Sequence, residues 1–311
     1  MSRKKMQKKS KNGLGWLLLG IMVVFIGLIF IPKNKTESIS FPDLHGLSFS
    51  SDGTKLVAAV HDGLREYSDG KWTTPDGEKN DYMGYSPIKN GFYSSGHPGP
   101  TSSLKNPLGI VKSQDNGKTI DVVDLHGEVD FHSLTVGYET EDLYVYTPEP
   151  NSKMKEAGFY YSKDKAKSWN EMDLNGLTGN PRTIIAHPTQ KGVVVIGTDK
   201  GLYLSNDYGE SFQLLSDDII ASTGTISSQD ELIVGQNTDE KKIIKIGLNN
   251  KEVMNVDLPK NIDGNIMYIT NNYNNPDEIA IATDQINVYV SKNNGADWES
   301  IVNLGKGINQ E

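Results

Sequence analysis

One eight-residue pattern recurs along this chain and restricts its fold more than any other feature. It reads Ser, any residue, Asp or Asn, any residue, Gly (Ala in one copy), any residue, Thr, Ser or Asp, and finally an aromatic residue or Ile. The copies begin at Ser113, Ser162, Ser205 and Ser291, which are 49, 43 and 86 residues apart. Because 86 is twice 43, we expect a degenerate copy near residue 248, and the turn at 247–251 fits it. A shortened copy at 68–72 lies 45 residues before the first, so the chain holds six units.

Each unit contains four short β-prone runs separated by turn residues. In the first and last units these runs cover 46–49, 56–60, 64–67 and 72–74, and 266–270, 278–282, 287–291 and 298–302. Four antiparallel strands in a period of about 40–50 residues are typical of a propeller blade. An open sandwich of the same strands would leave long edges and would not explain the period. We therefore predict an all-β chain with a six-bladed β-propeller at 41–304 and a C-terminal tail at 305–311.

The repeated pattern has a local structural explanation. Its Asp accepts hydrogen bonds from backbone N–H groups of its own turn, its Gly tolerates positive φ, and its last residue packs between sheets. We expect a structural role for the four residues at its third position, Asp115, Asp164, Asp207 and Asn293.

These residues resemble the Asp-box, or BNR repeat, of sialidases, sortilin-type receptor ectodomains, a photosystem assembly factor and several glycanases. The chain is also similar to exported bacterial proteins labelled glycosyl hydrolases. Three copies depart from the pattern, with Ala166 in place of Gly, Asp297 in place of Thr and Ile120 in place of the aromatic residue. The resemblance implies that the box turns, between the third and fourth strands, lie opposite the ligand-binding face.

The N-terminal region has the features of a signal-anchor. Residues 14–31 form an uncharged run of 18 residues, about 27 Å long as a helix, which is close to the thickness of a membrane. Six basic residues precede it within a tail at 1–13, whereas only Lys33 and Lys35 follow closely. The positive-inside rule then predicts a single-pass protein of the cell membrane, with a cytoplasmic N-terminus, a linker at 32–40 and an extracytoplasmic propeller. A removed signal peptide is the alternative.

Composition excludes several functions. From residue 14 onward, 25 basic residues face 40 acidic residues, which argues against nucleic acid as a partner. The chain has no cysteine, so it forms no disulfide and performs no thiol chemistry. It also has no Gly-x-Ser-x-Gly elbow, phosphate loop or dinucleotide fingerprint.

Polar residues gather where the first three blades begin. The first strand of a blade starts, and the second strand ends, at the same face of the ring, which we call the mouth. Asp43, Asp81 and Asp130 lead into blades one to three, and His45 and His132 follow two residues after the first and last of them. Since residues i and i+2 of a strand point the same way, each Asp–His pair is expected to face the central channel.

Further mouth candidates come from the loops. His61, Asp62 and His97 lie in the loops between second and third strands, Arg182 leads into blade four, and Tyr82 lies at the start of blade two. Asp199 and Asp284 occupy positions that match Asp62, but they read as turn residues. The loops at 92–109 and 147–158 are long and cover the same face, and Tyr82, Tyr85, Tyr93 and Tyr146 could stack on sugars or pack between blades.

Several chemistries are open to this set. Imidazole and carboxylate suit a divalent metal, for which His45 and His132 are the candidates, or they suit acid–base work. The alternative is that each Asp caps a turn and each His bonds to backbone. No cofactor is certain, and no tight metal-binding motif occurs in the sequence.

A sialidase is excluded by counting arginines. The family resemblance implies three arginines around the substrate carboxylate, whereas this chain has only Arg3, Arg65 and Arg182, and Arg3 precedes the anchor. Glycoside hydrolysis needs two carboxyl groups, which Asp43, Asp62, Asp81 and Asp130 could supply. We expect a mouth that binds an envelope glycan or an exported protein, through His45, His61, His97, His132, Tyr82 and Arg182. The alternatives are a glycoside hydrolase and an assembly scaffold, so whether the chain is an enzyme stays open.

Overall fold

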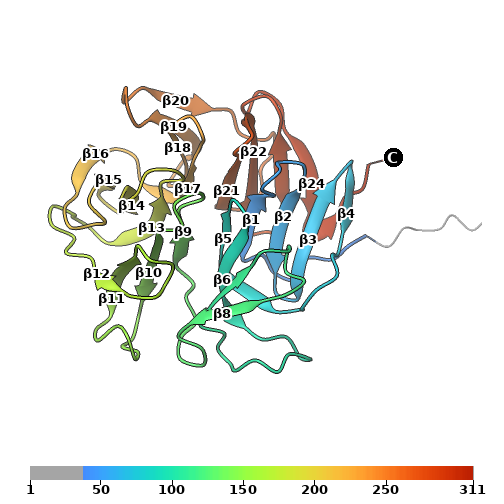
Figure 1. Cartoon of the computed structure of the whole chain (residues 1–311). Coiled ribbons are helices and arrows are strands. Elements are labelled where there is room, and N and C mark those ends of the chain that lie inside the picture. Colours follow the sequence, from blue (N-terminus) through green and yellow to red (C-terminus); the bar gives the residue numbers. More distant parts are fainter. Residues whose placement is uncertain (1–37, 311) are drawn as a thin grey trace, which may run out of the picture. The chain divides into compact units, whose positions relative to one another are not determined.

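The structure is a computed structural model that describes residues 38–310. These residues form six antiparallel sheets arranged around a central axis (Figure 1). In every blade the strands lie in chain order from the axis outward. Blades one and two contain β1 (Gly46–Phe49), β2 (Leu56–Val60), β3 (Gly63–Ser68), β4 (Lys71–Thr73), β5 (Asp81–Ile88), β6 (Gly91–His97), β7 (Ile110–Ser113) and β8 (Asp121–Asp124). Blades three and four contain β9 (Leu134–Val136), β10 (Leu143–Thr147), β11 (Gly158–Ser162), β12 (Asn170–Glu171), β13 (Pro181–Ala186), β14 (Val194–Thr198), β15 (Gly201–Ser205) and β16 (Gln213–Ser216). Blades five and six contain β17 (Ala221–Ile226), β18 (Glu231–Asn237), β19 (Lys241–Gly247), β20 (Val253–Val256), β21 (Ile266–Asn272), β22 (Asn275–Thr283), β23 (Val288–Ser291), β24 (Glu299–Asn303) and β25 (Lys306–Gly307). The predicted six-bladed propeller is confirmed.

The hydrophobic core consists of six clusters, one at each junction between neighbouring blades. The second strands lie between two layers of side chains, and both β2 and β14 are buried along their whole length. This explains their unbroken apolar sequences, LVAAV and VVIGT, where a half-exposed strand would alternate. Each blade therefore depends on its neighbours for burial of its faces.

Both ends of the described chain take part in closing the ring. The innermost strands β1 and β21 are neighbours, so blade six packs on blade one (Figure 1). Ser40 pairs with Lys306 of β25, and the N–H of Gly307 donates to the carbonyl of Ile39 at 2.8 Å. The predicted boundaries of the propeller, 41 and 304, are therefore too narrow. Residues 305–310 continue blade six instead of forming a free tail, because β25 pairs with β24.

The box turns have the expected geometry. In the first box, Asp115 Oδ1 accepts from the N–H of Thr119 at 2.9 Å, and Oδ2 accepts from its hydroxyl at 2.7 Å. The box glycine, Gly117, has a φ of 82°. The last residue of each box contacts the core at the junction with the preceding blade. Asp115, Asp164, Asp207 and Asn293 thus hold their own turns, as predicted.

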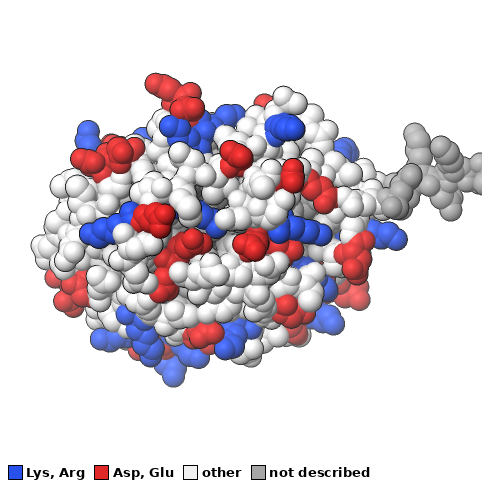
Figure 2. Space-filling view, turned by 90° about the horizontal axis from the view of Figure 1, so that it is seen from above, with Lys and Arg blue, Asp and Glu red and all other residues white. Residues whose placement is uncertain are grey.

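The predicted membrane segment at 14–31 lies outside the described residues. Within residues 38–310 no helix is long and apolar enough to cross a membrane. Figure 2 shows Lys and Arg interspersed with Asp and Glu on one face of the molecule, without a continuous basic surface there.

Candidate functional site at the propeller mouth

The first strands of all six blades line a central cavity of about 400 Å³. Because every first strand starts at the mouth, His45, His132 and Arg182 lie at the mouth end of this cavity. The predicted convergence of these residues on one opening is therefore observed. The imidazoles and carboxylates of blades one to three form two separate groups at this end.

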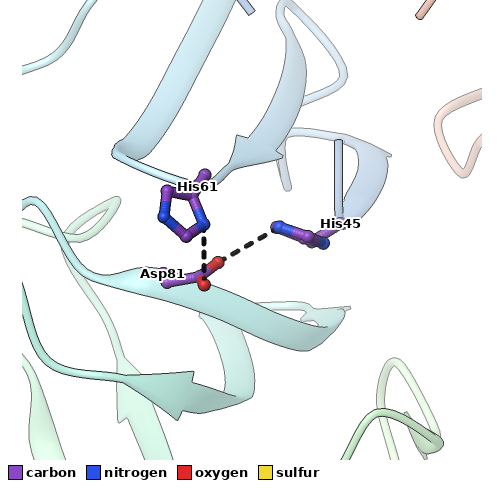
Figure 3. Close-up of side chains that lie close together, drawn as sticks. All are labelled: His45, His61 and Asp81. Atoms are coloured by element: carbon purple, nitrogen blue, oxygen red, sulfur yellow. Dashed lines mark ion pairs between the residues drawn. The ribbon is translucent and has the colours of Figure 1, made fainter. Parts of the chain in front are cut away.

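The first group joins blades one and two. His45 precedes β1, His61 lies in the turn between β2 and β3, and Asp81 begins β5 (Figure 3). Asp81 lies between the two rings, with Oδ1 3.3 Å from His45 Nε2 and Oδ2 3.0 Å from His61 Nδ1. Ligand atoms of these three residues all lie within 4.8 Å of one another, so the group is able to hold a metal ion. Asp43 is more distant, with Oδ2 4.0 Å from His45 Nε2.

Burial distinguishes the members of this group. The Asp81 side chain is 7% exposed, whereas that of His61 is 66% exposed. The backbone N–H of His45 donates to the carbonyl of Ala59 at 2.8 Å, which fixes the position of His45 beside β2. The group therefore combines two mostly buried side chains, His45 and Asp81, with the exposed imidazole of His61.

The second group joins blades two and three. Asp130 Oδ2 lies 2.9 Å from His132 Nε2 and 3.3 Å from His97 Nε2. His97 Nδ1 is 2.7 Å from Asn106 Oδ1, in the long loop that follows β6. Both rings approach the same carboxylate oxygen, which distinguishes this group from the first. The expected pairing of Asp130 with His132 is present, and His97 adds a second imidazole.

The other predicted acids have different surroundings. Asp62 forms an ion pair with Arg65, whose guanidinium also donates to the carbonyls of Ser40 and Leu64. Arg65 is therefore buried and committed, and Asp62 neutralises it instead of joining the mouth groups. Asp199 accepts two hydrogen bonds from Asn180, which holds the pKa of its carboxyl below the usual value.

The tyrosines expected at the mouth divide into buried and partly exposed ones. The prediction that Tyr82 binds the ligand is wrong, because Tyr82 is fully buried and its ring packs edge-on against that of Phe92, with 5.4 Å between the ring centroids. Burial raises the pKa of its hydroxyl above the ordinary value. Tyr93 is also buried, and its hydroxyl donates to Glu141 at 2.8 Å. Tyr85 lines the cavity, and Tyr146 is 38% exposed beside Phe159.

Contacts between neighbouring blades differ from the predicted pairs. His45 was paired with Asp43 and His61 lies next to Asp62 in the sequence, whereas both imidazoles lie nearest to Asp81 of the next blade. The circular order of the blades could have predicted these contacts, because it places the loop after one blade's second strand beside the first strand of the next blade. Both His61 with Asp81 and His97 with Asp130 follow this rule. Asn106 had no signal in the sequence pattern.

A family model and a curated protein each match part of this chain. The Sortilin-Vps10 family model, described as sortilin, neurotensin receptor 3, matches residues 109–257. A xyloglucanase of Hypocrea jecorina (strain QM6a) is 40% identical over 58 residues, which are 19% of this chain and 7% of that protein.

Two solved structures share the fold at low sequence identity. The GH74 enzyme of Niastella koreensis matches with a TM-score of 0.55 and 16% identity, over 85% of this chain and 46% of that one. The GH74 xyloglucanase of Xanthomonas campestris matches with a TM-score of 0.53 and 13% identity, over 86% of this chain and 46% of that one. The chain thus spans less than half of either structure. Its described part is a six-bladed β-propeller with Asp-box turns, and it shares this fold with both structures.

Proposed function

We propose that this chain is a membrane-anchored, extracytoplasmic propeller that binds an envelope glycan at its mouth. The observation that carries the proposal is the group of polar side chains from blades one to four at the opening of the central cavity. His61 and His132 are 66% and 68% exposed, and each lies beside a mostly buried carboxylate. Imidazole and guanidinium N–H groups donate to sugar hydroxyl oxygens, and carboxylates accept from sugar hydroxyls. The likeness of the chain to a xyloglucanase adds support for a glycan.

Binding to a panel of envelope glycans tests this proposal. The full-length chain, purified in a mild detergent, is compared with His132→Ala and Arg182→Ala. A glycan at about 100 times its dissociation constant should stabilise the wild-type chain by about 2.7 kcal/mol. Both variants should weaken this effect. Glu139→Gln is the control, because Glu139 is in the turn between β9 and β10, at the opposite face. The proposal fails if no glycan binds, and binding of an exported protein would then be the next hypothesis.

Glycoside hydrolysis is the second candidate, because Asp43, Asp81 and Asp130 all occur at the mouth. Such a reaction requires one carboxyl as acid and another as base or nucleophile, about 5–10 Å apart. Release of shorter sugars from the glycan that binds is the measurement. Asp81→Asn and Asp43→Asn should abolish turnover in a hydrolase while leaving binding measurable. A chain that binds the glycan and never releases a product is a binding protein.

The anchor is tested separately. The uncharged run at 14–31 and the six bases before it are the basis of this part of the proposal. The full-length chain should remain in the membrane fraction after alkaline carbonate extraction, and protease added outside intact cells should degrade the propeller. Recovery in the soluble fraction, or protection from external protease, would contradict it. A removed signal peptide would show as a shorter mature chain.

A further inference from the structure

We propose that His45, His61 and Asp81 bind one divalent transition-metal ion of the zinc class. The site needs only these three side chains, so it does not depend on which ligand the mouth binds. Two imidazole nitrogens and a carboxylate oxygen form a donor set that suits zinc and its neighbours better than calcium or magnesium, which prefer oxygen alone.

The distances between the donor atoms fit a metal ion. Zinc bonds to imidazole nitrogen and carboxylate oxygen are about 2.0–2.2 Å long, which places two ligands of a tetrahedral site about 3.3 Å apart. Asp81 offers Oδ1 at 3.3 Å from His45 Nε2 and Oδ2 at 3.0 Å from His61 Nδ1, and one donor atom from each of the three residues lies within 4.8 Å of the others. A small rotation of the exposed His61 side chain would bring its nitrogen to an ion held by the Asp81 carboxylate and His45.

Unsatisfied buried atoms provide independent support. Asp81 Oδ1 and His45 Nε2 are buried, and neither has a hydrogen-bond partner among the described residues. They are 3.3 Å apart, so their orientation and not their separation prevents a hydrogen bond. Such buried groups are costly unless something pairs with them. An ion between them would bond to the lone pairs of both atoms.

The framework around the donors is rigid on one side and open on the other. Asp81 begins β5, and its Cα pairs with that of His97 in the sheet. His45 is fixed to β2 through its backbone. The exposed His61 reaches the ion from a turn at the mouth, which leaves a coordination position for water or for an oxygen atom of a bound ligand. Three protein donors and one open position are the arrangement of reactive zinc sites.

The group around Asp130 provides an internal contrast. Its two imidazoles both approach Oδ2, and His97 Nδ1 is occupied by Asn106. Among residues 38–310, one group of three His, Asp or Glu side chains has its donor atoms within 4.8 Å of one another, and it consists of His45, His61 and Asp81. His61 and His132 form a matched pair, since both are about two-thirds exposed and both lie about 3 Å from a carboxylate.

A metal titration of the untagged full-length chain tests the site. The chain is stripped with a chelator, and Zn²⁺ is then added while binding is followed by calorimetry and by metal analysis after dialysis. We expect one equivalent of zinc in the wild type. His61→Ala should weaken binding by more than the 10- to 100-fold typical of outer-shell partners. His132→Ala should bind zinc as the wild type does, and circular dichroism should show both variants folded.

Cobalt gives a second readout of the same site. Co²⁺ in a four-coordinate site of nitrogen and oxygen donors absorbs visible light strongly, and this band should disappear in His61→Ala and Asp81→Asn but persist in Asp130→Asn. The proposal is overturned if the wild type binds no zinc, or if His61→Ala and Asp81→Asn bind it as tightly as the wild type. It is also overturned if only the variants at His132 and Asp130 lose the ion. No glycan is present in the titration, so failure of the glycan proposal does not affect its result.

Discussion

Asn293 and Asp297 show how a departure from the box pattern is compensated. In the third box, Asp207 accepts from both the N–H and the hydroxyl of Ser211. In the fourth, Asn293 Oδ1 accepts from the N–H of Asp297 at 2.8 Å, while its amide nitrogen donates to Asp297 Oδ2 at 3.0 Å. Donor and acceptor have exchanged positions between the two side chains. Asn at the third position and Asp at the seventh therefore act as a matched pair.

This exchange makes a prediction for the fourth box. Asn293→Asp would replace the amide donor by a second carboxylate, next to that of Asp297. We expect a loss of roughly 1 kcal/mol in the free energy of unfolding at pH 7, because both groups are exposed and solvent screens their repulsion. Asn293→Asp with Asp297→Thr restores the ordinary box and should recover that loss. Urea denaturation measures both, and the interpretation is wrong if the double variant is no more stable than the single one.

His187 is a buried histidine on the face opposite the mouth. It is 1% exposed, and its Nδ1 accepts from the N–H groups of Thr189 and Gln190. Its Nε2 lies 3.1 Å from Asp230 Oδ1, in the turn between β17 and β18. Burial lowers the pKa of His187 below 6.5, although Asp230 opposes this effect. The neutral ring of blade four is therefore buried against the turn of blade five.

The lowered pKa of His187 predicts a loss of stability in mild acid. Because the folded pKa lies below the unfolded value, the unfolded chain binds more protons as the pH falls from about 6.5. The stabilisation is complete above that pH and declines below it, down to the folded pKa. His187→Asn keeps an acceptor for the turn but does not titrate. Melting temperatures between pH 7.5 and 5 should fall more steeply for the wild type than for this variant, and parallel curves would refute the prediction.

At the scale of strands and blades, tryptophan indoles connect neighbouring blades. The indole N–H of Trp72 donates to the carbonyl of Ile301 at 2.8 Å, and the indole N–H of Trp169 donates to Asp124 Oδ2 at 2.9 Å. Asp124 also forms an ion pair with Lys153 at 2.8 Å. Trp72 lies on β4 and Trp169 directly precedes β12, the outermost strands of their blades. Each indole therefore adds a directional bond between the outer part of its blade and the neighbouring blade.

The surroundings of these two tryptophans predict different costs of removal. Trp72→Phe removes one of the two donors to the carbonyl of Ile301 in a buried place, because Trp72 is 3% exposed, while the N–H of Ile308 still donates to that carbonyl. We expect a loss of about 1 kcal/mol in the free energy of unfolding. Trp169→Phe should cost less, since Trp169 is only partly buried and Lys153 still pairs with Asp124. Chemical denaturation at neutral pH gives the order, and an equal or reversed order would contradict this account.

At the scale of the whole molecule, the number of blades was predictable because its signals are local. Turn residues, apolar runs and the box pattern recur within each unit, and the two strands predicted at 46–49 and 56–60 in blade one agree with β1 and β2. Ring closure was not predictable, because the pairing of Ser40 with Lys306 joins segments that are far apart and carry no repeat. A short strand such as β25 also has too few residues to show alternation.

The location of the candidate site was predictable, but of its pairs of side chains only Asp130 with His132 was. The directions of the strands place the beginnings of all first strands at one face, so His45, Asp81 and His132 were expected near the cavity. Which imidazole meets which carboxylate depends on how far each blade rotates relative to the next. The spacing of residues within one strand does not contain this rotation. The same reason explains Tyr82, whose burial against Phe92 follows from packing between the first two blades.

Closure of the ring predicts that its last residues are essential to stability. The N–H of Gly307 donates to the carbonyl of Ile39, and the N–H of Gln310 donates to the carbonyl of Gly70. The side-chain oxygen of Asn309 accepts from the backbone N–H of Trp72. A chain ending at Gly305 would lose all three bonds and expose part of Trp72. We expect its free energy of unfolding to fall by roughly 3 kcal/mol or more. Asn309→Ala, which removes one bond, should cost about 1 kcal/mol. If the shortened chain melts like the wild type, packing of β1 on β21 closes the ring alone. If it melts at a much lower temperature, β25 is needed to hold the N-terminal segment at Ser40 against blade six, because β25 pairs with both Ser40 and β24.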